Sequence, residues 1–311
     1  MHRALDSLGR PRRCPAGRLA LALPSILLLT GCAGGVLDPK GPVGADAANI
    51  LIVSTVIMLA IVIPTILMAF WMAWRYRASN TRAEYLPYWS YSGRIEAVVW
   101  SIPILTIMFI GGVIWIGSYR LDPFRPLDSK TPPLEVQVVA LDWKWLFIYP
   151  QQGIATVNQL VVPAGTPVHF SITSASVFNS FFIPQLGSMI YAMPGMVSQL
   201  HLQADNPGQL RGISAQFSGD GFSDMDFPVK SVPAGEFGTW ATSVRSAGPV
   251  LDRGAYDVLL RPSQRDPPSS FGSVDPQLFH AIAIQTIPPA PGPEPGNPGH
   301  AGREVSTRGR Q

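Results

Sequence analysis

Two long apolar stretches lie near the start of this chain, from about Ala48 to Trp74 and from about Ile95 to Tyr119. Each is longer than the roughly 20 residues that cross the hydrocarbon core of a bilayer. Charged residues make up only 14% of the chain, against about 25% in soluble domains. The stretches therefore predict two transmembrane helices, 48–74 and 95–119, within a membrane hairpin that covers residues 45–120.

The charges between the two stretches predict which way the hairpin faces. One glutamate, Glu84, stands there among four arginines: Arg75, Arg77, Arg82 and Arg94. Short loops rich in Lys and Arg stay in the cytoplasm. The loop is therefore predicted to be cytoplasmic, and everything after about residue 120 is predicted to lie outside.

Residues 1–31 are typical of a signal peptide of the lipoprotein type. Several arginines precede an apolar run from Leu19 to Leu29, the pattern of an export signal. The sequence Leu29-Thr30-Gly31-Cys32 then matches a lipobox, in which the cysteine is acylated and becomes the mature N-terminus. We therefore expect a lipid on Cys32 and a protein of the bacterial inner membrane. The alternative is a plain signal with an incidental cysteine.

The region after the hairpin changes to short alternating segments divided by turns. Residues 131–242 show this pattern, with a turn at 163–167 as one example, and it predicts an all-β sandwich or barrel. Residues 248–285 mix apolar and charged positions and are expected to form an arm that packs on this domain or on a partner. The Pro- and Gly-rich tail, 288–311, is expected to be disordered. The sequence has no basic face interleaved with aromatics, so nucleic acid is not an expected partner.

A loop between Gly212 and Met225 has the spacing of a two-copper centre without its ligands. Such a centre needs two cysteines four residues apart, a histidine four residues further on, and a methionine three after that. Those positions hold Ser214, Ser218, Phe222 and Met225. Hydroxyl oxygen is a hard, weak ligand for copper and a phenyl ring is none. We therefore expect this chain to bind no metal or other cofactor.

Other residues with metal-binding side chains have simpler interpretations. His169 and His201 lie within predicted strands at spacings that suit no metal site, and they are interpreted as structural or surface histidines. Met189, Met193 and Met196 lie around a turn, where methionine most often fills gaps in packing.

Glu96 interrupts the apolar pattern at the start of the second predicted helix. By itself it fits an interfacial glutamate that pairs with Arg94 or reaches water. An ionisable side chain in a membrane segment is also a candidate for a proton path.

The order of these parts resembles subunit II of the haem–copper terminal oxidases over about residues 45–285. The resemblance implies a cupredoxin-like sandwich. It also places Asn179 where copper-bearing members have a further histidine ligand, and Gln216 where they have a glutamate. The stretches 142–150, 153–158, 179–184 and 212–215 closely resemble the bo-type ubiquinol oxidases, the branch that lacks this copper centre.

The resemblance implies a subunit without catalytic cofactors in a proton-pumping quinol oxidase. Subunit I would hold two haems, one copper and most of the quinol site, and further small membrane subunits would complete the complex. Ubiquinol would be oxidised and dioxygen reduced to water. Family members carry a glutamate at the position of Glu96, which implies the mouth of a proton channel there.

The resemblance also leaves alternatives open. Trp143 and Trp145 lie near an electron-entry aromatic of the copper-bearing relatives, but without copper they are interpreted as packing residues. A cytochrome c oxidase would need cysteines at 214 and 218. A menaquinol oxidase subunit and a membrane lipoprotein outside any oxidase are the remaining alternatives.

Overall fold

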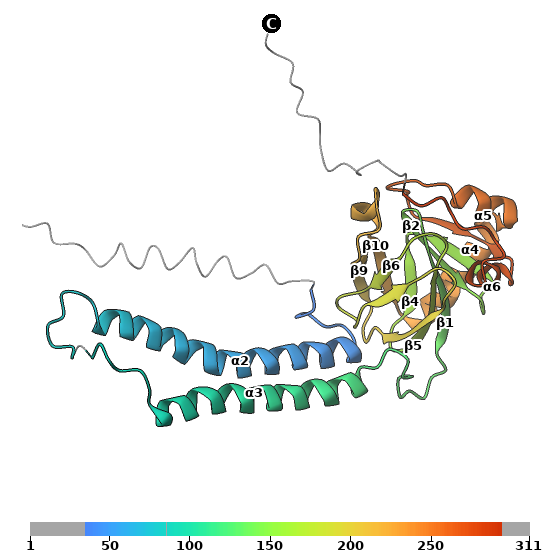
Figure 1. The fold of residues 1–311 in the computed structure, drawn as a ribbon. Helices are drawn as coiled ribbons and strands as arrows, with labels where there is room; N and C mark the ends of the chain where they lie inside the picture. The colour runs from blue at the N-terminus through green and yellow to red at the C-terminus, as the bar shows by residue number, and fades with distance from the viewer. Residues whose placement is uncertain (1–34, 85, 294–311) are drawn as a thin grey trace, which may run out of the picture.

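The computed structural model describes residues 35–84 and 86–293, and two long helices form its first part (Figure 1). Helix α2 runs from Pro42 to Arg75 and helix α3 from Gly93 to Arg120. They include both predicted spans and extend beyond them at each end. At 34 residues, α2 is about 50 Å long, well over the roughly 30 Å of a bilayer core. Residues 1–31 and Cys32 lie outside the described residues.

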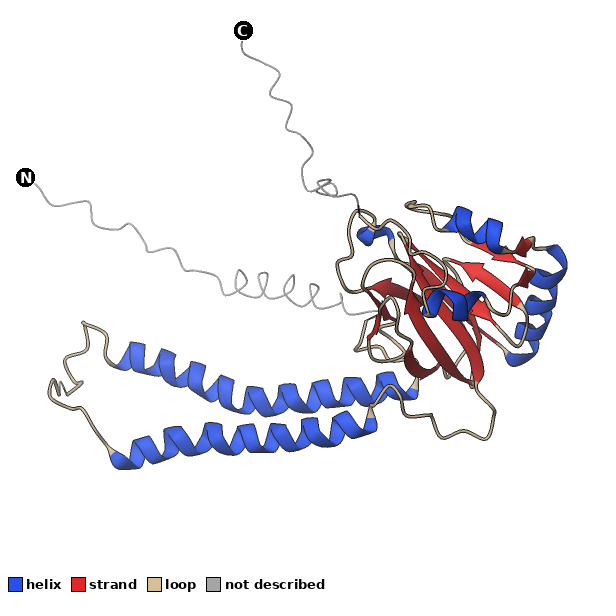
Figure 2. Cartoon of the chain, turned by 45° about the vertical axis from the view of Figure 1, so that its right-hand side comes forward, coloured by secondary structure: helices blue, strands red, loops and turns tan. Residues whose placement is uncertain are grey.

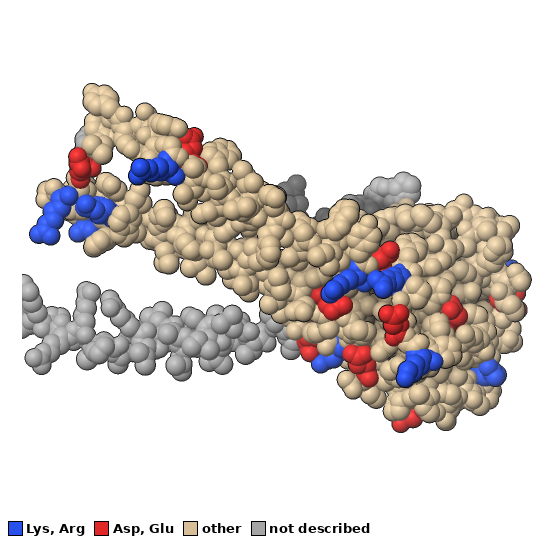
Figure 3. Space-filling model, turned by 90° about the horizontal axis from the view of Figure 1, so that it is seen from below, with Lys and Arg blue, Asp and Glu red and all other residues tan. Residues whose placement is uncertain are grey.

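The hairpin surface is suited to lipid or to other apolar surfaces. Both helices contain apolar windows whose residues are unburied within the chain. Seen from below in Figure 3, the charged side chains gather at the two ends of the hairpin and leave its middle uncharged. These features fit a pair of membrane-crossing helices with a domain attached at one end.

The first turn of α2 packs directly against the folded domain. A Cβ at Gly44 would lie 2.6 Å from the Gln185 carbonyl oxygen, and one at Gly187 would lie 2.8 Å from the Val43 side chain. Real Cβ contacts are longer than this, so only glycine allows the approach. The two helices come equally close to each other where a Cβ at Gly117 would lie 2.8 Å from Ile50.

The domain is a sandwich of two main sheets, as the alternating pattern predicted. One sheet has the order β12-β3-β2-β1-β5-β8 and the other β4-β10-β9-β6-β7, while β11 and β13 pair separately. The strands are β1 (Leu134–Leu141), β2 (Lys144–Tyr149), β3 (Ile154–Val157), β4 (Leu160–Pro163), β5 (Pro167–Ser174), β6 (Asn179–Phe182), β7 (Ile190–Ala192), β8 (Ser198–Gln203), β9 (Gly208–Ser214), β10 (Phe227–Val232), β11 (Val250–Leu251), β12 (Ser269–Phe271) and β13 (Ser273–Val274).

Strand β2 is buried on both faces. Trp145, Phe147 and Tyr149 pack in the core between the two sheets. Leu146 and Ile148 point the other way, into a second apolar cluster that residues 251–287 help to form. Successive side chains of a strand point to opposite faces. Because each face of β2 packs in its own apolar cluster, consecutive residues from Trp145 to Tyr149 are all apolar or aromatic.

The arm, residues 248–285, contributes part of the second cluster and covers the outer face of the larger sheet. It contains α5 (Arg253–Leu259) and α6 (Leu278–Ala283), and α4 (Ala234–Ala247) leads into it from the sandwich. Figure 2 shows these short helices beside the strands. The predicted domain limit at residue 242 falls inside α4, so the sandwich and the arm are joined by a continuous helix.

The structure describes the beginning of the predicted tail, residues 288–293, against the domain. The Ala290 amide donates to the Ala175 carbonyl oxygen at 2.9 Å, and the Gly292 amide donates to the Asp142 carboxylate at 2.9 Å. Backbone groups bonded to the domain hold residues 288–293 in place. Proline and glycine composition alone could not show these contacts. Residues 294–311 lie outside the described residues.

Candidate functional site

The loop with copper-site spacing, between Gly212 and Met225, joins β9 to β10 at one end of the sandwich. It is called the copper-like loop below. Ser214 is the last residue of β9, Phe222 begins a short 3-10 helix (η2, Phe222–Asp224), and Met225 follows it. Ser214, Ser218 and Met225 are buried. Asn179 is the first residue of β6, the strand that pairs with β9, and it is also buried. The structure therefore brings Asn179, which only the family resemblance connected to the loop, together with the three positions that the loop spacing predicted.

The side chains at the ligand positions form hydrogen bonds with one another instead of binding a metal. The Ser214 hydroxyl donates to the Asn179 side-chain oxygen at 3.3 Å, and the Ser218 hydroxyl lies 3.8 Å from the Met225 sulfur. The Ala215 amide donates to the Ser180 hydroxyl at 2.8 Å. Their polar groups thus have partners within the protein, as buried polar groups require.

The donor set does not fit copper. Copper sites of this kind use thiolate, imidazole and thioether ligands, and of these only the Met225 thioether is present. Phe222 packs its ring against Phe217, with the ring centroids 5.6 Å apart, and Gln216 is exposed. Among the described residues, no group of three or more His, Cys, Asp or Glu side chains is arranged to hold a metal ion.

Two tryptophans support the loop by packing. Trp143 and Trp145 both belong to the central core. A Cβ at Gly221 would lie 2.0 Å from the Trp143 ring, so the indole lies directly against the loop backbone. The Trp145 indole N–H donates to the Met225 carbonyl oxygen at 3.2 Å. Both rings therefore contribute to the loop's conformation.

Glu96 lies in the first turn of α3, at the far end of the hairpin from the sandwich. Its side chain is exposed on the isolated chain, and among the described residues no ion pair joins it to Arg94 or to any other cation. A carboxylate there is favoured by the helix N-terminus. The structure thus places Glu96 far from the copper-like loop.

The comparisons with known proteins agree with this architecture. The family described as cytochrome c oxidase subunit II, periplasmic domain, matches residues 105–232, and the family described as COX aromatic rich motif matches residues 245–287. The chain is 52% identical to cytochrome bo(3) ubiquinol oxidase subunit 2 of Pseudomonas aeruginosa, over 84% of this chain and 79% of that protein. It is 53% identical to ubiquinol oxidase subunit 2 of Acetobacter aceti, over 85% of this chain and 86% of that protein.

The chain belongs to the bo-type ubiquinol oxidase subunit II family. A quinol oxidase subunit 2 of Bacillus cereus is more distant, at 34% identity over 78% of this chain and 84% of that protein. The match to the periplasmic-domain family covers the loop with Ser214, Ser218 and Phe222. This subunit II therefore keeps the cupredoxin-like fold of its family while its loop lacks the cysteine and histidine ligands.

One polar cluster of this subunit II was not predicted from the sequence. His169 and His201 are directly opposite across β5 and β8, and Glu135 is opposite His169 on β1. The two rings stack with centroids 4.5 Å apart, and the His169 Nδ1 atom lies 2.6 Å from the Glu135 carboxylate. His201 Nδ1 donates to the Pro123 carbonyl oxygen at 3.1 Å. The histidines thus tie the linker after α3 to the sheet.

A buried ion pair joins the sandwich to the arm. The Lys144 side chain is 3% exposed, and its ammonium lies 2.9 Å from the Asp266 carboxylate. Ser263 and the Arg261 carbonyl oxygen also accept from it. Burial acts to raise the pKa of Asp266, but hydrogen bonds from Ser263 and Lys144 and the Lys144 charge outweigh it and hold that pKa below its ordinary value.

Proposed function

We propose that this chain is subunit II of a respiratory oxidase in which ubiquinol gives up electrons and dioxygen is reduced to water. The observation that carries the proposal is the loop from Ser214 to Met225, which lies between β9 and β10 with the spacing of a copper loop but lacks the ligands for copper. The identity to two ubiquinol oxidase subunits, at 52% and 53%, supports the same conclusion.

The location of the electron donor explains why the loop needs no metal. A soluble cytochrome donates from the aqueous side, so its oxidase needs a relay centre in the outer domain. Ubiquinol is dissolved in the bilayer and can meet a membrane-embedded catalytic subunit directly. The sandwich then serves as a folded cover, and the hairpin serves as its membrane attachment.

In this proposal the catalytic centre belongs to subunit I, which would hold two haems and one copper. The unburied apolar surface of α2 and α3 is suited to packing against such a membrane partner and against further small subunits. No step of the reaction is assigned to the copper-like loop.

Glu96 is proposed as a proton entry point on the cytoplasmic side. Its exposure and the absence of an ion pair to any described cation leave the carboxylate able to exchange protons with water or with a partner subunit. It begins α3, whose preceding loop carries the arginines that predict a cytoplasmic location.

We further propose that the chain is anchored in the bacterial inner membrane by a lipid on Cys32, with the sandwich in the periplasm. The lipobox supports the anchor, and the arginine-rich loop supports the orientation. Growth with radiolabelled palmitate tests it: label on the wild-type chain and none on Cys32→Ser is expected. Equal labelling of both would contradict the anchor.

Oxygen uptake by the detergent-extracted, copurified complex tests the main proposal. Rapid uptake with ubiquinol and none with reduced cytochrome c is expected. Uptake only with cytochrome c would overturn it, and the absence of a haem-bearing partner would favour a lipoprotein outside any oxidase.

A menaquinol oxidase is the second candidate, and the chain is also 34% identical to a subunit 2 of Bacillus cereus whose name, quinol oxidase, specifies no quinone. Comparing uptake with a benzoquinol and a naphthoquinol separates the two. Faster turnover with the benzoquinol is expected, since the higher identities are to ubiquinol oxidase subunits.

A further inference from the structure

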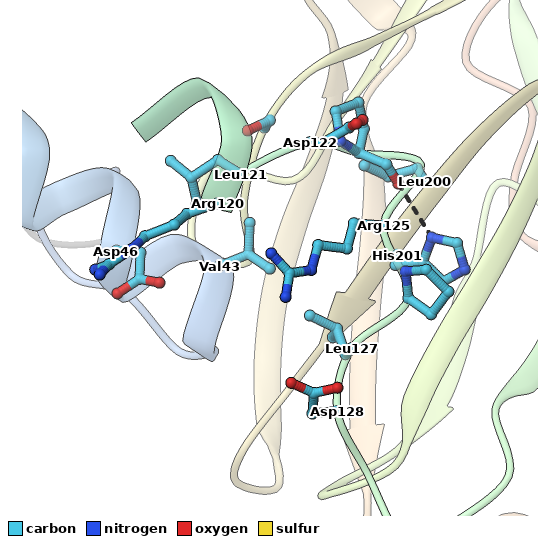
Figure 4. Close-up of a pocket in the computed structure, with 13 residues that line it drawn as sticks. Val43, Asp46, Arg120, Leu121, Asp122, Arg125, Leu127, Asp128, Leu200 and His201 are labelled. Carbon is cyan, nitrogen blue, oxygen red and sulfur yellow. Dashed lines mark hydrogen bonds between the residues drawn. The ribbon is translucent and has the colours of Figure 1, made fainter. Parts of the chain in front are cut away.

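A polar hollow lies where the helical hairpin meets the sandwich, away from the copper-like loop. It has a volume of about 330 Å³ and is lined by the start of α2, the end of α3, the linker after it and β8. Figure 4 shows Asp46 and Arg120 on the helix side, with Arg125, Asp128 and His201 on the linker and sheet side. The volume falls within the roughly 300–1,000 Å³ of small-molecule sites.

The charges in this hollow are not paired with one another. Among the described residues, no carboxylate lies within ion-pair distance of Arg120 or Arg125. Three carboxylates, those of Asp46, Asp122 and Asp128, line the same space. Guanidinium groups bind phosphate oxygens through paired hydrogen bonds. The hollow therefore offers cations to a phosphate and carboxylates to a separate positive group.

An apolar crevice lies between α2 and α3 and shares two residues with the polar hollow. Asp46 and Arg120 line both spaces. The crevice has a volume of about 220 Å³, and its walls are mostly apolar: Ile50, Val53, Val113, Ile116 and Gly117, with Asn49 beside them. The contact of Gly117 with Ile50 holds the helices together at this level.

The polar hollow and the apolar crevice follow one another as the headgroup and hydrocarbon layers of a bilayer do. The polar hollow lies at the sandwich ends of α2 and α3, and the crevice lies beside it between their apolar residues. With these helices across a bilayer, the hollow would be near the lipid headgroups. Figure 3 shows charged side chains at this junction and none along the middle of the hairpin. A ligand that fits both must have a charged end and an apolar chain.

We propose that this junction binds one phospholipid with an ethanolamine headgroup from the outer leaflet. Its phosphate contacts Arg120 and Arg125, its ammonium faces the carboxylates of Asp46 and Asp128, and one acyl chain lies in the crevice. A headgroup with phosphate alone would bring no cation to Asp46 and Asp128. The lipid connects the hairpin, the linker and the sheet, and its binding is independent of the electron donor.

Native mass spectrometry of the detergent-extracted protein, with the subunits that copurify, tests this proposal. The wild-type chain is expected to keep phosphatidylethanolamine after repeated detergent washing. The double variant Arg120→Gln/Arg125→Gln is expected to bind it at least about tenfold more weakly, because two charge-assisted contacts are lost. The control Arg211→Gln removes an exposed arginine that pairs with Asp226 on the sandwich, and should keep the lipid.

Exchange into nanodiscs of phosphatidylethanolamine or phosphatidylglycerol tests the headgroup. Wild type should retain the ethanolamine lipid preferentially, and Asp46→Asn/Asp128→Asn should lose that preference. The proposal is overturned if the double arginine variant retains the lipid like wild type, or if both lipids are retained equally. It is also overturned if the arginine variant loses a partner subunit instead of lipid, since the hollow would then be a subunit contact.

Discussion

The Ser214 hydroxyl donates a hydrogen bond to the side-chain oxygen of Asn179, 3.3 Å away, across two strands that meet at the copper-like loop. Both residues are buried, and each occupies a position where copper-bearing relatives are expected to have a ligand. The hydrogen bond adds a side-chain contact to the antiparallel pairing of β6 and β9. Asn179, Ser214, Ser218 and Met225 are therefore all buried at one end of the sandwich, in a loop with copper-site spacing but no metal ligand set.

Restoring the ligands should restore copper binding. Because the family resemblance places ligands at these positions, Asn179→His, Ser214→Cys, Ser218→Cys and Phe222→His together would surround Met225 with soft ligands. Copper content and a thiolate-to-copper absorption band measure the result. The two cysteine substitutions alone serve as the control and should bind copper more weakly. A fourfold variant that folds but takes up no copper would show that the backbone has diverged.

The Lys144–Asp266 pair should contribute measurably to the stability of the sandwich. Asp266→Asn would leave a buried ammonium without its carboxylate, which costs about 3–5 kcal/mol for fully buried pairs. Asp266 is partly exposed, so we expect a loss of about 2 kcal/mol. Asp257→Asn breaks the exposed Arg253–Asp257 pair of the arm and should cost under about 0.5 kcal/mol. Urea denaturation measures both, and equal effects would contradict the burial argument.

The same pair predicts a pH dependence of stability. The pKa of Asp266 is lowered in the folded chain, so its contribution is complete above the unfolded value of about 3.9. It is lost as the pH falls through the lower, folded pKa. Asp266→Asn should therefore lose less stability than wild type on acidification below about pH 4. The free energy of unfolding of both proteins is measured from pH 6 to pH 3. An equal loss in the two proteins would contradict the prediction.

Glu96 should control proton supply to the oxidase. Replacing it by glutamine keeps its size but removes the ionisable group, so we expect slower oxygen uptake and weaker proton pumping by the complex. The control is Glu84→Gln, in the loop before α3, which should leave both rates unchanged. Unaltered turnover and pumping in Glu96→Gln would remove this glutamate from the proton path.

Gly44 should be required for docking the domain on the hairpin. Gly44→Val places side-chain atoms where even a Cβ would lie 2.6 Å from the Gln185 carbonyl oxygen, and overpacking of this kind costs about 1–3 kcal/mol. Faster hydrogen exchange around residues 185–187 is expected. The neighbouring Ala45 is exposed, so Ala45→Val should leave the exchange unchanged.

Local sequence patterns predicted much of this fold because the signals were themselves local. Apolar length predicted both helices, and alternation predicted the strands. The row formed by Glu135, His169 and His201 could not be found that way, since it depends on the register of three strands that are distant in sequence. The contacts of Ala290 with Ala175 and of Gly292 with Asp142 were not predicted either, because they join residues that are distant in sequence.

The arm that covers Leu146 and Ile148 has a consequence for biogenesis. The residues that complete this second core, 251–287, are synthesised and exported after the strands β1–β3 that they cover. Until they arrive, the larger sheet presents an apolar outer face to the periplasm. Folding of the domain can therefore be completed only after residues 251–287 have been exported. A chain that ends before Val250 would expose that face to aggregation and to proteases.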